Sequence, residues 1–231
     1  MLKSLIARFG RISHEVVHPN DRKQWIEQLR KPWFEVVRPF DRSLPSIFQE
    51  ARRLEKKHLQ NCRVVPSRIT LLEECLPKEG IVAELGTLYG HWAKEILHIT
   101  RPKELHLFDL SFDRFERVHF IDGINAGQVY LHQSYSAQAL EEFPDHYFDW
   151  IYIDADHTYW GVKQDIDVSM RKVKPDGFLV FNDYIYWSHF ELVEYGVVHA
   201  VNELCIDGGY EILFFALDTL MYCDVVLRKM Q

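Results

Sequence analysis

The chain has 231 residues, of which 47% are hydrophobic, so it is long enough for one α/β domain with a sizeable core and a modest extra segment. Its formal net charge of −7 argues against general nucleic-acid binding, and no apolar run approaches the roughly 20 residues that cross a bilayer. The four scattered cysteines lack metal-binding spacing and indicate reduced thiols in a cytoplasmic protein.

Residues 1–62 are expected to form a helical extension that serves as a cap, a docking element or a dimerisation element. Four prolines break this segment into short pieces. Within it, residues 1–14 place apolar and basic side chains at helical spacing. Such a pattern is typical of a helix that docks on protein or makes peripheral contact with a membrane surface. The charged stretch Glu50–Lys57 is compatible with a homodimer.

From residue 63 onward, the chain is predicted to be one domain in which short apolar runs alternate with helical patterns. The expected elements, in chain order, are a helix over 66–76, a strand over 81–85, a helix over 92–99, a strand over 104–109, a helix over 114–124, a strand over 129–132, a helix over 137–143, a strand over 148–153, a helix over 159–173, a strand over 177–181, a helix over 190–205, and strands over 211–217 and 222–227. Five β-then-α units predict a parallel sheet with helices on both faces. Only Asp218–Met221 separates the last two strands, so they must form an antiparallel hairpin.

A glycine-containing loop, Gly86 to Gly90, follows the first strand of this domain. Glycine lets the chain turn tightly and lets a ligand approach the backbone. Asp109 ends the second strand, where an acid can accept hydrogen bonds from both ribose hydroxyls of a nucleoside. Together these features indicate a nucleoside-containing cofactor. They do not decide which one, although a dinucleotide would need a free helix N-terminus and a third glycine where this chain has Tyr89, His91 and Trp92.

Polar side chains follow the next two parallel strands. Asp154, Asp156 and His157 come after the strand over 148–153, and Asn182 and Asp183 come after the strand over 177–181. The carboxyl ends of parallel strands meet at one edge of the sheet, which predicts that Asp154, Asn182 and Asp183 converge. Three oxygen ligands suit Mg²⁺, Mn²⁺ or Ca²⁺. The alternatives are that Asp156 caps the following helix and that Asp183 is a turn residue.

These motifs resemble those of class I S-adenosylmethionine-dependent methyltransferases, over about two thirds of the chain. Within that class, they are most similar to the metal-dependent O-methyltransferases that act on macrolide sugars and rhamnosyl groups. The resemblance is carried by the loop Glu84…Gly86…Gly90, by Asp109, by Ile153-Asp154-x-Asp156-His157-x-Tyr159, and by Lys174-Pro175-x-Gly177 before Asn182-Asp183-Tyr184. Ala155 and Asp176 depart from the pattern, because both stand where the family usually has glycine.

The resemblance implies a Rossmann-like seven-stranded sheet of order 3-2-1-4-5-7-6, with the last strand antiparallel and helices on both faces. It implies S-adenosylmethionine as methyl donor, with Gly86 and its loop at the methionine part, Asp109 at the ribose and Ser134 near the adenine. The full set of expected cofactor-binding residues is Glu84, Gly86, Thr87, Gly90, Asp109, Leu110, Ser134 and Asp154. The expected ligands of a divalent cation are Asp154, Asn182 and Asp183.

The reaction expected from this resemblance is methyl transfer to a hydroxyl of a small-molecule or glycan acceptor. A bound cation would lower the pKa of the acceptor hydroxyl, and a base would take its proton. His157 is the first candidate for this base and Asp156 the second. The alternatives are a catalytically silent binding subunit with this fold and an NAD-dependent oxidoreductase, which the closing hairpin disfavours. A protein or nucleic-acid methyltransferase is disfavoured by the acidic charge and by the lack of an Asn-Pro-Pro-Tyr-like run.

Overall fold

The computed structural model describes residues 50–191 and 193–230, so the expectations for residues 1–49 lie outside the described part of the chain. From Glu50 onward the chain forms one compact unit. The boundary expected at residue 62 lies inside this unit, where Ala51 is buried and Leu54 packs against the core. Among the described residues, no helix combines the length and the apolar character needed to cross a membrane.

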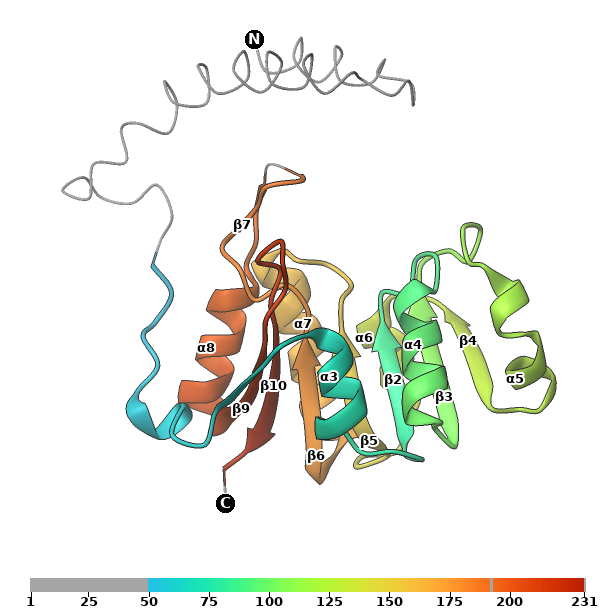
Figure 1. Cartoon of the computed structure of the whole chain (residues 1–231), viewed down its shortest axis with the longest axis horizontal. Helices are drawn as coiled ribbons and strands as arrows, with labels where there is room; N and C mark the ends of the chain where they lie inside the picture. Colours follow the sequence, from blue (N-terminus) through green and yellow to red (C-terminus); the bar gives the residue numbers. More distant parts are fainter. Residues whose placement is uncertain (1–49, 192, 231) are drawn as a thin grey trace, which may run out of the picture. The chain divides into compact units, whose positions relative to one another are not determined.

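A central sheet of eight strands organises this unit (Figure 1). The strands are β1 (Arg63–Val65), β2 (Ile81–Leu85), β3 (Glu104–Asp109), β4 (Val129–Gln133), β5 (Phe148–Ile153), β6 (Val173–Phe181), β9 (Tyr210–Ala216) and β10 (Asp224–Lys229). Their order in space is β1-β9-β10-β6-β5-β2-β3-β4. Neighbouring strands are parallel except at β10, which is antiparallel to both β6 and β9.

An eighth strand at the edge, which the sequence did not reveal, corrects the expected count of seven and extends the expected order, which the other seven strands keep. β1 lies beyond β9 and pairs with it in parallel, with Arg63 opposite Phe214. Three residues are too few for a period-of-two pattern to stand out, which is why the sequence gives no sign of this strand. The closing hairpin between β9 and β10 forms as the short connection required.

Helices cover both faces of the sheet (Figure 1). The helical elements are η1 (Lys56–His58), α3 (Arg68–Thr70), its π-helical continuation η2 (Leu71–Cys75), α4 (His91–Thr100), η3 (Arg117–His119), α5 (Ile121–Asn125), α6 (Ser136–Leu140), α7 (Tyr159–Lys172) and α8 (Val197–Gly208). Two buried clusters result, one under α6, α7 and α8 and the other under α3, η2 and α4. In β5, Ile151 and Ile153 join the first cluster and Trp150 and Tyr152 the second, as the alternation of a strand requires.

The helix expected over 190–205 begins only at Val197. The residues before it form a short hairpin of β7 (Trp187–Ser188) and β8 (Val193–Glu194). Gly196 marks the change, because its N–H donates to the His157 carbonyl at 2.7 Å. A Cβ at Gly196 would lie 2.2 Å from the backbone of Tyr159. This close packing fixes the start of α8 against the loop that follows β5.

Candidate active site

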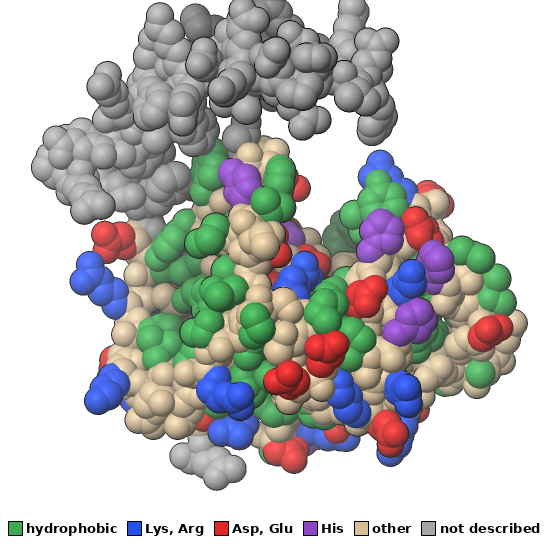
Figure 2. All heavy atoms as spheres, viewed as in Figure 1, with side chains coloured by type: hydrophobic (Ala, Val, Ile, Leu, Met, Phe, Trp, Pro, Cys, Tyr) green, Lys and Arg blue, Asp and Glu red, His purple; other side chains and the backbone are tan. Residues whose placement is uncertain are grey.

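The loops that follow the parallel strands meet at one edge of the sheet, where the surface is hollowed in Figure 2. Gly86 stands at the end of β2 with φ +86°, and a Cβ there would lie 2.1 Å from the carbonyl oxygen of Asp154. No other residue type fits this backbone conformation and this spacing together. Gly90 (φ +83°) closes the loop and leads into α4, where an added Cβ would lie 2.5 Å from the Phe115 ring.

Asp109 at the end of β3 holds this glycine loop in shape. Its Oδ2 accepts hydrogen bonds from the N–H groups of Thr87 (3.0 Å) and Leu88 (2.7 Å). Its Oδ1 accepts one from the N–H of Ser111 (3.1 Å). A carboxylate has about four acceptor positions, so roughly one remains for a ribose hydroxyl. Ser134 lies beside this residue, because its N–H donates to the Asp109 carbonyl at 3.0 Å.

Glu84 is a buried carboxyl group two residues before Gly86. Its side chain is 1% exposed, and Oε2 has no hydrogen-bond partner among the described residues. Burial raises its pKa well above the ordinary value, and the negative charge of Asp154 raises it further. Leu110, expected near the cofactor as well, is exposed on the loop after β3.

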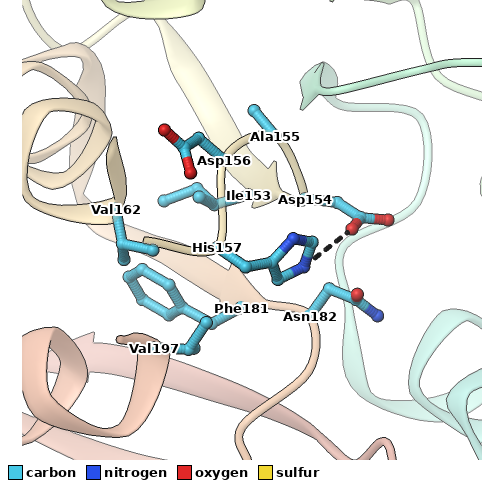
Figure 3. Close-up of a pocket in the computed structure, with 9 residues that line it drawn as sticks. All are labelled: Ile153, Asp154, Ala155, Asp156, His157, Val162, Phe181, Asn182 and Val197. Carbon is cyan, nitrogen blue, oxygen red and sulfur yellow. Dashed lines mark ion pairs between the residues drawn. The ribbon is translucent and has the colours of Figure 1, made fainter. Parts of the chain in front are cut away.

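His157 is the centre of the polar cluster after β5 (Figure 3). Its Nε2 lies 3.4 Å from Asp154 Oδ1 and 3.6 Å from Asp183 Oδ2, and its ring stacks on Tyr195 with centroids 4.4 Å apart. Burial alone would lower the pKa of His157, but the hydrogen bond and charge of Asp154, with the charge of Asp183, raise it above its ordinary value. The imidazole therefore carries a positive charge more readily here than in water.

Asp183 is unusual in both backbone and protonation. Its φ is +55°, a conformation that residues other than glycine rarely adopt. Burial first, and then the nearby charge of Asp154, raise the pKa of Asp183 to about 7. Strained residues of this kind concentrate where a side chain must be aimed at a ligand. Asp154, His157 and Asp183 thus form one electrostatically coupled set, in which Asp183 gains or loses a proton near neutral pH.

Asp156, the second expected base, is not brought into this set. Its Oδ1 accepts a hydrogen bond from the Thr158 N–H at 2.8 Å, and in Figure 3 its carboxylate points away from His157. Thr158 caps α7 by accepting from the Gly161 N–H at 3.1 Å. Thr158 thus takes the capping position that the sequence offered for Asp156, and Asp156 holds the turn before the helix; its role as a second base stays a prediction.

Three residues that the sequence did not single out lie beneath the cluster. Asp224 Oδ2 accepts from Arg68 Nε at 3.1 Å and from the Tyr152 hydroxyl at 2.7 Å, and Arg68 also contacts the Tyr152 hydroxyl. Burial raises the pKa of Asp224 to about 6. The one sequence signal was an acid directly before the apolar run Val225-Val226-Leu227, since a charge at the start of a buried strand needs a partner.

The expected cation ligands do not fit a divalent ion in this arrangement. Asp154 and Asp183 are both within ion-pair distance of the His157 imidazole, which a cation held by both carboxylates would have to displace. Asn182 turns its Nδ2 to Asp224 Oδ1 at 3.1 Å and to the Tyr152 hydroxyl at 3.2 Å. Across residues 50–191 and 193–230, no group of three His, Cys, Asp or Glu side chains is placed to hold a metal.

Comparison with known proteins supports a methyltransferase fold. Residues 83–184, less than half of the chain, match the family model described as a methyltransferase domain. No curated protein matches the chain. An O-methyltransferase family protein from Burkholderia thailandensis has a TM-score of 0.52 at 13% identity, over 71% of this chain and 55% of its own. A ribosomal protein L11 methylase from Lactobacillus delbrueckii subsp. bulgaricus has a TM-score of 0.51 at 16% identity, over 81% and 91%.

The pyocyanin biosynthetic protein PhzM has the same fold, with a TM-score of 0.51 at 15% identity, over 70% of this chain and 54% of its own. The chain thus spans little more than half the length of two of these three structures. At such identities the likeness concerns the fold alone. The chain has the α/β fold of S-adenosylmethionine-dependent methyltransferases, with a methyltransferase domain matched over residues 83–184.

Proposed function

We propose that the protein is an S-adenosylmethionine-dependent methyltransferase that methylates a hydroxyl group of a small molecule. The observation that carries this proposal is the position of the coupled set Asp154, His157 and Asp183 directly beside the glycine loop. Gly86 touches the backbone of Asp154, so a cofactor bound on this loop would lie next to the coupled set. When bound, this cofactor supplies a methyl group already activated by a sulfonium centre.

The residues of the chain bind the cofactor and take up the proton of the acceptor. Asp109 and Ser134 hold the nucleoside part, and the Gly86 loop lets it approach the backbone. The carboxyl group of Asp154 favours a positively charged sulfonium by simple charge attraction. The coupled set then accepts the proton of the acceptor hydroxyl, with His157 as the first candidate for the receiving base. Positioning the acceptor in line with the methyl group supplies the larger part of the rate.

Apolar side chains border the site on the side of β6 and β9, which favours an apolar or aromatic acceptor. Phe190 is 67% exposed and Met221 69% exposed, on the two loops beside Asp183. These loops are joined, because the hydroxyls of Ser188 and Tyr222 lie 2.9 Å apart and Phe190 stacks on the Tyr222 ring. Exposed apolar surface beside a polar site is typical of a ligand-binding region.

The test has two stages. Calorimetric titration with S-adenosylhomocysteine and with NAD establishes the cofactor, and we expect micromolar binding of the former alone. Turnover of S-adenosylmethionine with a panel of phenols and glycosides then establishes the acceptor, and we expect phenols to be the better substrates. Binding of NAD alone would overturn the proposal. Cofactor binding without turnover of any hydroxyl acceptor would favour a silent binding subunit instead.

A further inference from the structure

Tyr195 lies between the candidate base and the hairpin of β7 and β8. It follows β8 directly and is 7% exposed. Its ring stacks on the imidazole of His157, with centroids 4.4 Å apart and ring planes inclined by 19°. A contact of this kind stabilises a pair of rings beyond the apolar area that it buries. The face of the Tyr195 ring therefore supports the side chain that is the first candidate for the base.

The other contacts of the His157 imidazole do not fix its plane. Its Nε2 lies 3.4 Å from Asp154 Oδ1 and 3.6 Å from Asp183 Oδ2, and both distances are long for a hydrogen bond. Nε2 is also buried, and it has no well-aligned hydrogen-bond partner among the described residues. In Figure 3 the ring reaches toward Asp154 from the loop that follows β5. Charge attraction thus keeps the imidazole near the two carboxylates without setting the angle of its ring.

The backbone next to Tyr195 is packed against the same loop. The N–H of Gly196 donates to the His157 carbonyl at 2.7 Å, and a Cβ at Gly196 would lie 2.2 Å from the backbone of Tyr159. Gly196 directly follows Tyr195 in the chain. Because this packing leaves no space for a shift, the Tyr195 backbone stands at a fixed distance from His157.

Tyr195 is also held from the side of the hairpin, which Figure 1 labels at β7. Its N–H donates to the Tyr186 carbonyl at 2.9 Å, and its hydroxyl donates to Glu191 Oε2 at 2.8 Å. The N–H of Glu191 donates in turn to Ser188 Oγ at 3.1 Å. Both the backbone and the far end of the Tyr195 side chain are therefore bound to the hairpin, so its ring is a fixed surface for the imidazole.

We propose that Tyr195 is a positioning residue for the candidate base. Its ring holds the His157 imidazole at the angle that keeps Nε2 beside Asp154 and Asp183, and so aims the base at the acceptor hydroxyl. Tyr195 acts through His157 and does not itself touch the acceptor. The inference rests on the proposed function, and it concerns a residue outside residues 83–184, which the methyltransferase family model matches.

A merely structural role for Tyr195 predicts a different outcome. The side chain belongs to the buried cluster under α6, α7 and α8, and in that case its loss would act only through stability. Tyr210 is the matched control, because it is buried in the same cluster at the start of β9. Since β9 and β6 are both antiparallel to β10, the start of β9 lies at the edge of the sheet opposite the candidate site. Tyr195→Leu and Tyr210→Leu should both lower the free energy of unfolding, but only the first should disturb His157.

The first measurement is NMR spectroscopy of the imidazole in the full chain, without ligands. Protons that lie over the face of an aromatic ring resonate upfield, so the carbon-bound ring protons of His157 report the stack. Their signals are assigned with His157→Gln. We expect Tyr195→Leu to move them downfield and Tyr195→Phe to leave them unchanged, because phenylalanine keeps the ring. Tyr210→Leu should also leave them unchanged.

The second measurement is methyl transfer to the best phenol of the panel. Tyr195→Leu should lower kcat by about 10- to 100-fold, since a misplacement of about 1 Å can cost about 100-fold in rate. Tyr195→Phe and Tyr210→Leu should keep kcat within about 3-fold of the unaltered protein, because both leave the ring that supports the base in place. The affinity for S-adenosylhomocysteine should stay unchanged in all three variants, because the base is not part of the cofactor site.

Two results would overturn the inference while the proposed function stands. One is a His157 signal that does not move in Tyr195→Leu. The other is an equal loss of kcat in Tyr195→Leu and Tyr210→Leu at a temperature at which both are folded. Tyr195→Met fills the space with a flexible apolar chain and takes the place of Tyr195→Leu if that variant does not fold. If the unaltered protein methylated no hydroxyl acceptor, the proposed function would fail and the role of Tyr195 with it.

Discussion

Gly86 and Asp154 are in backbone contact at the centre of the candidate active site, with room for a hydrogen atom and no more between them. A Cβ at Gly86 would lie 2.1 Å from the carbonyl oxygen of Asp154. The N–H of Asp154 donates in turn to the Leu85 carbonyl at 2.8 Å, so the ends of β2 and β5 are locked together. The glycine loop therefore also determines where the coupled set around His157 stands.

Replacement of Gly86 by alanine should disrupt both stability and ligand binding. The left-handed backbone costs alanine about 1–2 kcal/mol, and forcing the loop away from Asp154 adds about 1–3 kcal/mol to the loss in unfolding free energy. Gly209→Ala is the matched control, because Gly209 has a similar φ of +71° and no atom within 4 Å of an added Cβ. Urea unfolding and titration with S-adenosylhomocysteine measure the two effects. Equal effects of the two substitutions would refute the close-contact argument.

The protonation of the coupled set should appear in the pH dependence of turnover. A base works only when it is unprotonated, and the pKa of His157 is raised while that of Asp183 is about 7. Activity should therefore rise with pH, with a midpoint above the ordinary 6.5 of a free imidazole. His157→Gln should lower kcat by about 10²- to 10⁴-fold and leave the affinity for S-adenosylhomocysteine unchanged.

The control for this experiment is His119→Gln, which alters a histidine paired with Glu116 on η3. This substitution should leave the pH dependence of turnover unchanged. A rate that stays constant from pH 6 to pH 8 in the unaltered protein would show that the set does not titrate during turnover. Full activity of His157→Gln would show that another group takes the proton.

The strand ends could be located from sequence because apolar runs and turn residues are local signals. Gly86, Asp109 and Asp154 each follow a run of buried residues, and parallel topology alone brings such positions to one edge. The same reasoning placed Asp154 and Asp183 near one another. These predictions needed only the order of the strands along the chain.

Features that depend on pairing between distant segments were not accessible in this way. Arg68 and Asp224 meet only because β10 inserts between β6 and β9. The sequence around either residue does not predict that the other is its partner. The rotation of Asn182 toward Asp224 and Tyr152 follows from the same network. The expected cation site does not form in this arrangement, because Asn182 is held by Asp224 and Tyr152. The sequence could not predict these contacts, because the three residues lie far apart along the chain.

Chelation tests whether the His157 imidazole takes the place of a cation. Because its Nε2 lies within 3.6 Å of both carboxylates, it offsets their negative charge without a metal. We expect turnover to persist in excess EDTA and to change by less than about 3-fold on addition of Mg²⁺ or Mn²⁺. The measurement uses protein dialysed against chelator, with metal content verified by mass spectrometry. A loss that Mg²⁺ restores would reinstate Asp154, Asn182 and Asp183 as ligands.

Asp165 on α7 should make stability depend on pH in an unusual direction. It is buried, it accepts a hydrogen bond from the Ser136 hydroxyl at 2.5 Å, and burial raises its pKa to about 6. Between about pH 4 and pH 6 the folded chain therefore holds a proton that the unfolded chain has lost. The contribution of this group to the unfolding free energy falls as pH rises through that window, by on the order of 3 kcal/mol in total.

Asp165→Asn removes this dependence, since an amide cannot ionise and still accepts from Ser136. The unfolding free energy of the variant minus that of the unaltered protein should increase from pH 4 to pH 7.5, as measured by urea unfolding at several pH values. Asp167→Asn, at an exposed position of the same helix, is the control. If the two curves for Asp165→Asn and the unaltered protein ran parallel across the window, Asp165 would not carry the extra proton. The buried carboxyl would then be ionised, and a cation would have to lie near it.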